Sequence, residues 1–238
     1  MIKAALFDVF GTCVDWRTGV ADFVRPMLIE RELPTDNAEK IADAWRQLYD
    51  PAMAHVRDGR RPYVTLDVIQ RENLDIVLHE LGLEEHFDDE HRNHLNGAWE
   101  ALPAWDDTQE TLEILKQNMP IAACSNGSQT MMRILAQYAG LNWSMICGAD
   151  TGRNFKPHSD VYLKSCAAMG ADPAETLMVA CHADDLDAAA SFGLKTAFFP
   201  CPKEWGPSEY ITESNPDRFD FYAVDFPTLA EQIIVASK

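Results

Sequence analysis

The chain has 238 residues, enough to bury a sizeable core in one domain or in two small ones. With 47% apolar and 24% charged residues, it has the composition of an ordinary globular protein. Its formal net charge of −18 argues against nucleic acid and anionic membrane surfaces as partners, because both require basic surface. A small anionic substrate remains compatible with this charge, since a few cationic side chains can bind one locally.

The first residues, "MIKAALFDVF", predict a core strand and show no signal-peptide pattern. No run of about 18 consecutive apolar residues, the length of a membrane-spanning helix, occurs in the chain. The cysteines lack C-x-x-C spacing, so the spacing indicates neither a zinc site nor a disulfide framework. We therefore expect a cytoplasmic protein with reduced cysteines, which are Cys13, Cys124, Cys147, Cys166, Cys181 and Cys201.

Short apolar runs alternate with helical patterns along most of the chain. The runs predict strands at 3–9, 119–124, 144–148, 176–181, 194–199 and 221–225. The patterns between them predict helices at 106–117, 128–139, 159–169 and 184–192. This alternation predicts an α/β fold with a parallel, Rossmann-like sheet covered by helices on both faces.

The stretch from 15 to 101 breaks the alternation, because it shows only helical patterns. They lie at 18–31, 37–57, 67–81 and 87–99. An all-helical insertion directly after the first strand predicts a cap domain, 15–101, over the carboxyl edge of the sheet, where open α/β sheets bind ligands. The core domain then comprises 1–14 and 102–238.

Polar side chains occur where four of the predicted strands end, so they should meet at that edge. In chain order they are Asp8 with Thr12, Ser125 with Asn126, Lys156 before a proline, and His182 with Asp184 and Asp185. The order Asp-x-x-Gly-Thr, strand-Ser-Asn, Lys-Pro and a final acidic motif resembles the haloacid dehalogenase superfamily. The resemblance covers essentially the whole chain, including the position of the cap.

Two further matches point within that superfamily to the 2-haloacid dehalogenases. "WRQ", with Arg46 in the predicted cap, resembles the arginine that draws off the halide in those enzymes. Lys156 and Tyr162 match their Lys-Pro-x-x-x-x-Tyr pattern. Their fourth motif typically reads Ser-x-Asn-x-x-Asp; here it reads "ACHADD", so only the final aspartate, Asp185, is kept and His182 replaces the asparagine.

Phe10, two residues after Asp8, bears on the reaction type. Phosphatase-type members of the superfamily carry a second aspartate there as general acid, whereas a phenylalanine transfers no proton. A halide leaves without a proton, so Phe10 favours displacement at carbon by Asp8, with a transient ester. Cys181 stands where a Mg²⁺-binding aspartate would be expected and is a poor ligand for a hard cation, although Asp184 offers a substitute. We expect no metal and no other cofactor.

The resemblance implies a role for each residue in the displacement. Asp8 attacks the α-carbon of a short (S)-2-haloalkanoic acid, Arg46 and Asn126 stabilise the departing halide, and Lys156 with Ser125 holds the substrate carboxylate. The expected partners are thus a small 2-haloacid and a halide ion. A homodimer is expected from the family.

The second step hydrolyses the ester. The resemblance implies that Asp185 orients or deprotonates the attacking water, while His182 is a second candidate for this role, found in this sequence. Thr12 aims the Asp8 carboxylate, and Phe10, Trp45 and Tyr63 are expected to form walls that exclude water.

Other interpretations remain at this stage. A Mg²⁺-dependent phosphatase of the same superfamily is one, and a non-catalytic protein that binds small anions is another. Arg46 has a structural alternative as the partner of Asp43 or Asp50, and Asp185 as a brace between loops. Fluoroacetate is included among candidate substrates because His182 replaces an asparagine in the halide pocket.

Overall fold

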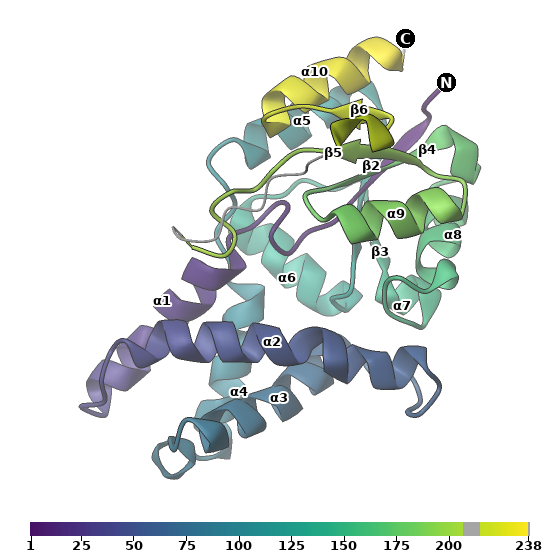
Figure 1. Ribbon diagram of the computed structural model, residues 1–238. Helices are drawn as coiled ribbons and strands as arrows, with labels where there is room; N and C mark the ends of the chain where they lie inside the picture. Colours follow the sequence, from purple (N-terminus) through teal and green to yellow (C-terminus); the bar gives the residue numbers. More distant parts are fainter. Residues whose placement is uncertain (207–214, 238) are drawn as a thin grey trace.

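The sheet at the centre of the molecule contains six parallel strands. The computed structural model describes residues 1–206 and 215–237, and in it the strand order is β3-β2-β1-β4-β5-β6 (Figure 1). The strands are β1 (Ala4–Phe7), β2 (Ile121–Ser125), β3 (Met145–Gly148), β4 (Thr176–Ala180), β5 (Lys195–Phe198) and β6 (Phe221–Tyr222). Every paired strand runs parallel to its neighbour, so the α/β prediction is confirmed.

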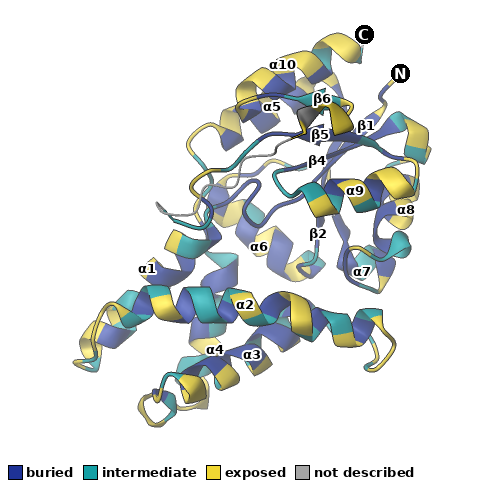
Figure 2. Ribbon diagram, in the orientation of Figure 1, coloured by how far each residue is buried: buried dark blue, intermediate teal, exposed yellow. Residues whose placement is uncertain are grey.

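Alternate residues of the strands face opposite layers of helices, as the period of a strand requires. Phe7 of β1 belongs to a core shared with α5 (Thr108–Asn118), α6 (Gln129–Ala139) and α10 (Phe226–Ala236). Its neighbour Leu6 belongs to a second core with α8 (Ser159–Ala168) and α9 (Ala183–Ser191). Figure 2 shows the central strands β1, β2 and β4 buried between these layers. A strand that is covered by helices on both faces buries every side chain, which explains why the sequence shows continuous apolar runs instead of an alternating pattern.

The segment 15–101 is helical, as predicted. It contains α1 (Trp16–Glu30), α2 (Asn37–Arg57), α3 (Leu66–Glu80) and α4 (Asp89–Asn96). A 3₁₀ turn at Glu84–His86 lies between α3 and α4, and a second one at Gly97–Glu100 follows α4 directly. The helix predicted at 87–99 is therefore α4 followed by this second turn. In Figure 1, α2, α3 and α4 form a separate layer of helices beside the sheet.

Among the described residues, two α-helices lack a counterpart among the predicted elements: α7 (Ala149–Gly152), a single turn, and α10 (Phe226–Ala236). Across 1–206 and 215–237, no helix combines the length and the apolar character needed to cross a bilayer.

The loops at the carboxyl edge are held by local hydrogen bonds. Asp15 caps α1 by accepting the Thr18 amide, and Ser128 caps α6 by accepting the Met131 amide at 3.0 Å. The Asp8 amide donates to the Val179 carbonyl of β4 at 3.0 Å. These bonds place the residues that follow β1 and β2 above the middle of the sheet.

Candidate active site

A cavity of about 430 Å³ lies between the carboxyl edge of the sheet and α2. Residues that follow β1, β2, β3, β4 and β5 contribute one side, and α2 contributes the other. The predicted site residues that line it are Asp8, Phe10, Arg46, Asn126, Lys156, His182 and Asp185. Motifs separated by up to 177 residues in sequence therefore converge, as the strand-end argument predicts.

Both oxygens of the Asp8 carboxylate accept hydrogen bonds. Oδ1 lies 3.1 Å from Lys156 Nζ, while Oδ2 lies 2.8 Å from Thr12 Oγ1 and 3.0 Å from His182 Nδ1. Burial raises the pKa of Asp8, but the Lys156 charge, His182 and the Thr12 hydroxyl outweigh it and hold that pKa well below its usual value. Asp8 is thus a buried carboxylate that stays ionised, as a nucleophile must be.

Lys156 joins two buried carboxylates. Its Nζ lies 3.1 Å from Asp8 and 2.7 Å from Asp185, whose other oxygen accepts the Tyr162 hydroxyl at 2.6 Å. Burial works against the ammonium charge, but both carboxylates outweigh it and raise the pKa of Lys156. Burial, aided by the nearby charge of Asp8, raises the pKa of Asp185. The backbone of Lys156 is fixed as well, because its amide donates to Asn126 Oδ1 at 2.8 Å.

His182 lies between Asp8 and a second acid, Glu204. Its Nδ1 faces Asp8, and its Nε2 lies 3.0 Å from each oxygen of Glu204. Burial opposes a charge on the ring, but the Cys181 sulfur, Asp8 and Glu204 together raise the pKa of His182 well above its usual value. The ring is therefore oriented at both nitrogens, with Nδ1 directed at the nucleophile.

Glu204 is a site residue that the sequence reasoning missed. It is 3% exposed, and its Oε1 also accepts the Trp16 indole N–H at 3.0 Å. Gly11 makes room for it: a Cβ there would lie 2.2 Å from Oε1, and the φ of Gly11 is +85°. The available signal was weak, because Glu204 stands six residues beyond the end of β5 in a loop without periodicity.

Arg46 enters the cavity through a set of aromatic rings. Its guanidinium carbon lies 4.5 Å from the ring centre of Tyr49, 5.4 Å from that of Trp205 and 5.6 Å from that of Trp16. Its Nε is buried and has no hydrogen-bond partner among the described residues. Cationic stacking on electron-rich faces holds the charge in place without neutralising it.

The surface ion pair considered for Arg46 is contradicted. Asp43 pairs with Arg17 at 2.6 Å, and Asp50 pairs with Arg57 at 2.8 Å. Within the described part of the chain, no carboxylate pairs with Arg46. Its charge is available to an anion in the cavity.

Tyr49 also lines the cavity and was missed. It lies three positions after Arg46 on α2, and this spacing puts two side chains on the same face of a helix. The sequence therefore contained a pattern that could have predicted Tyr49 beside Arg46. Burial raises the pKa of Tyr49 to about 12. Its ring meets Phe10 edge-on, with the ring centres 6.4 Å apart, so the residue two places after Asp8 is part of an apolar wall.

Three predicted site residues lie elsewhere. Ser125 is fully buried, and its Oγ accepts the Gly127 amide at 3.1 Å instead of facing the cavity. Trp45 is buried among the helices, where its N–H donates to the Gln70 carbonyl at 2.8 Å. The Tyr63 hydroxyl donates to Asp150. None of the three lines the cavity.

The residues around Asp8 do not suit the Mg²⁺ ion of phosphatase-type members. Mg²⁺ needs oxygen ligands in nearly octahedral geometry. Both Asp8 oxygens already face Lys156 and His182, whose pKa values are raised, and the neighbouring position of the fourth motif carries the Cys181 thiol. A different group of donor atoms, on Cys181, His182 and Glu204, lies within 4.8 Å of one another.

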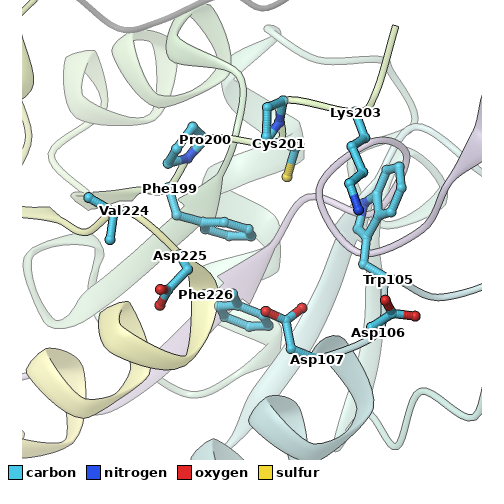
Figure 3. A pocket seen from close by; sticks show the side chains of 11 residues that line it. Trp105, Asp106, Asp107, Phe199, Pro200, Cys201, Lys203, Val224, Asp225 and Phe226 are labelled. Atoms are coloured by element: carbon cyan, nitrogen blue, oxygen red, sulfur yellow. The ribbon is translucent and has the colours of Figure 1, made fainter. Parts of the chain in front are cut away.

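A second cavity, of about 310 Å³, lies apart from Asp8 and is bounded by Trp105, Phe199 and Phe226 (Figure 3). Its wall touches the back of the Asp8 loop, because the Trp105 indole N–H donates to the Gly11 carbonyl at 2.9 Å. The contact supports the loop that carries Asp8 and Thr12.

Comparison with known proteins agrees with this geometry. A curated (S)-2-haloacid dehalogenase of Xanthobacter autotrophicus is 32% identical over 200 residues, 83% of this chain and 74% of that protein. The crystal structure of a defluorinating L-2-haloacid dehalogenase superposes with a TM-score of 0.91 at 38% identity, covering 97% of this chain and 94% of that one. A curated phosphoglycolate phosphatase of Chromobacterium violaceum is 30% identical over 196 residues, 81% of this chain and 82% of that protein.

The family model for haloacid dehalogenase-like hydrolases matches residues 2–193. With that match and the four strand-end motifs assembled around one carboxylate, the chain belongs to the haloacid dehalogenase-like hydrolases.

Proposed function

We propose that the chain hydrolyses short (S)-2-haloalkanoic acids to 2-hydroxy acids through an ester on Asp8. One observation carries the proposal: an ionised Asp8 shares its cavity with the Arg46 guanidinium, which pairs with no carboxylate of the described residues, while Phe10 offers no proton. A nucleophile, an anion site and the absence of a general acid at this position suit a leaving group that departs as a stable anion.

In the first step an Asp8 oxygen bonds to the α-carbon from the face opposite the halogen. The carbon–halogen bond breaks, and its electron pair leaves with the halide toward Arg46 and the Asn126 amide. The Lys156 ammonium donates one hydrogen bond to Asp8 and one to Asp185, so its third N–H remains for the substrate carboxylate. Phe10 and Tyr49 supply an apolar wall against the reacting carbon.

In the second step water attacks the carbonyl carbon of the Asp8 ester. His182 takes the water proton in this proposal, because its Nδ1 faces Asp8 while Glu204 holds Nε2. An ester carries no charge, so once it has formed the imidazolium loses one of its two anionic neighbours and releases its Nδ1 proton to solvent, which leaves Nδ1 free to accept the proton from water. The bond between the Asp8 carbonyl carbon and the substrate oxygen breaks, and His182 gives the proton it took from water to that oxygen, so the 2-hydroxy acid leaves. The Asp8 carboxyl group then loses its proton to His182, which restores both the carboxylate and the imidazolium.

Asp185 has a positioning role in this scheme. Both of its oxygens are engaged, by Lys156 and Tyr162, and neither contact directs it at the Asp8 carbonyl carbon. Thr12 donates to Asp8 Oδ2 and keeps the carboxylate plane fixed.

Fluoroacetate belongs to the proposed substrates. The carbon–fluorine bond is the hardest of the series to break, so the departing fluoride needs strong donors. The likeness to a defluorinating dehalogenase supports its inclusion. A Mg²⁺-dependent phosphatase is the weaker alternative, since Phe10 replaces the general acid and Cys181 a metal ligand.

The assay follows halide release from chloroacetate, fluoroacetate and (S)-2-chloropropionate in the presence of a chelator, with a general phosphatase substrate plus Mg²⁺ in parallel. We expect halide release that Asp8→Asn abolishes. Phosphate release without halide release would support the phosphatase. Release of neither halide nor phosphate would support a protein that only binds small anions.

The division of the chain into a core domain and a cap domain is also a proposal. Residues 1–14 and 102–238 form the core that carries Asp8 and Lys156, with 207–214 and 238 outside the described residues, and 15–101 form the cap that brings Arg46. A cytoplasmic location is supported by six free cysteines, four of them buried. A homodimer is expected from the family and is tested by the molar mass in solution.

A further inference from the structure

We infer that Cys181, His182 and Glu204 form a binding site for one zinc ion next to Asp8. Cys181 Sγ lies 3.7 Å from His182 Nε2 and 3.8 Å from Glu204 Oε2, and Nε2 lies 3.0 Å from Oε2. Ordinary zinc bond lengths in a tetrahedron place sulfur and nitrogen about 3.6 Å apart, and nitrogen and oxygen about 3.3 Å apart. The donor atoms therefore already stand close to the separations that the ion requires.

The surroundings of these donors match those of protein zinc sites. A zinc-binding histidine usually donates its other ring N–H to a carboxylate, which fixes the ring. His182 Nδ1 lies 3.0 Å from Asp8, so that partner is in place. The Glu204 carboxylate is held in turn by the Trp16 indole N–H.

The donor set selects among metals. A thiolate, an imidazole and one carboxylate suit zinc, whereas Mg²⁺ and Ca²⁺ prefer oxygen ligands alone. Glu204 is 3% exposed and the Cys181 side chain is partly buried, so the ion would be largely shielded from solvent. His182 lines the cavity, from which water can take the fourth position. Binding releases the thiol proton and the Nε2 proton to solvent.

Sequence spacing alone did not indicate this site. An adjacent Cys-His pair with a glutamate 22 residues later matches no familiar zinc pattern. The fold supplies the third ligand, because Gly11 lacks a side chain and leaves room for Glu204 beside His182.

Zinc at this position would inhibit the enzyme. The ion replaces the proton that His182 shares with Glu204 and places two positive charges beside the ring, so the ring accepts a proton from water less readily. This consequence depends on the proposed role of His182, whereas binding itself does not.

The test starts with chelator-treated full-length protein and uses Co²⁺ as a spectroscopic substitute for zinc. We expect one equivalent to bind, with the strong visible bands of tetrahedral cobalt and a thiolate-to-cobalt band in the near ultraviolet. Cys181→Ser should remove the thiolate band. It should also weaken zinc binding, measured against a coloured chelator, by more than roughly 100-fold, the upper range for replacing a residue that merely supports a ligand.

Cys201→Ser is the matched control, and circular dichroism checks that both variants fold. Retention of the thiolate band in Cys201→Ser supports the site. Three results would overturn it: no stoichiometric binding, a thiolate band that survives in Cys181→Ser, or equal loss in both variants.

Halide release gives a second readout. One equivalent of zinc should inhibit the wild type, a chelator should reverse the effect, and Cys181→Ser should resist it; equal inhibition of that variant would contradict the assignment. If the protein releases no halide at all, the proposed function fails while the cobalt titration still decides the zinc site.

Discussion

Replacing Arg46 by methionine separates a functional charge from a structural one. Methionine keeps an apolar stem against the rings of Tyr49 and Trp205 but removes the guanidinium. Each cationic contact to an aromatic ring contributes roughly 0.5–1 kcal/mol at an exposed site. Burying the charged guanidinium costs free energy, because its Nε has no hydrogen-bond partner among the described residues. We expect these effects to offset each other, so the free energy of unfolding should change by no more than about 1 kcal/mol.

The effect on catalysis should be much larger. One hydrogen bond from a charged donor to the departing halide is worth about 1.5–3 kcal/mol. Loss of about 3 kcal/mol of transition-state stabilisation lowers kcat/KM roughly 150-fold, at 1.36 kcal/mol for each factor of ten. Arg46→Lys keeps the positive charge but lacks the planar guanidinium, so its kcat/KM should lie between the values of the wild type and Arg46→Met.

The assay measures initial rates of halide release from (S)-2-chloropropionate, and urea unfolding measures stability. Arg60→Met is the control, because Arg60 is exposed and pairs with Asp58 away from the cavity. The reasoning is refuted if Arg46→Met unfolds several kcal/mol more easily while keeping its kcat/KM, since Arg46 would then serve the fold.

Three further predictions concern other parts of the site. Lys156→Met leaves Asp8 and Asp185 as uncompensated buried carboxylates, so urea unfolding at neutral pH should show a loss of about 3–5 kcal/mol; an unchanged midpoint would contradict the ion-pair account. Because burial raises the pKa of Tyr49 to about 12, the unfolded state loses its proton first, and stability should fall as pH rises above about 10. Tyr49→Phe should lessen that fall by up to roughly 2–3 kcal/mol, and an identical alkaline profile would count against it. Gly11→Ala puts a methyl group at the position of Glu204 Oε1 and costs about 1–2 kcal/mol for its positive φ; ester hydrolysis should slow, and adding Glu204→Ala should recover part of the stability but not the rate.

The strand-end residues could be predicted because a parallel sheet brings the carboxyl ends of its strands to one edge. Asp8, Asn126, Lys156 and Asp185 each follow a buried strand or lie in the loop after one, so topology alone brings them together. No knowledge of side-chain contacts was needed for this part of the site.

Other positions depend on information that the sequence carries weakly. Trp45 precedes Arg46 directly, but one step along a helix turns the side chain by about 100°, so the two face different surroundings. Ser125 satisfies a neighbouring amide in its own loop, a local choice that no spacing reveals. Glu204 comes from a loop without periodicity, and only the folded chain shows that it reaches His182.

The central claim is that Asp8 becomes an ester, and a single turnover in water labelled with oxygen-18 tests it most directly. With enzyme in excess over (S)-2-chloropropionate, water attacks the Asp8 carbonyl carbon, so the label should appear in the peptide that contains Asp8, and the released 2-hydroxy acid should be unlabelled. Label in the hydroxyl group of the product and none in that peptide would mean that water attacks the substrate directly, which would contradict the account.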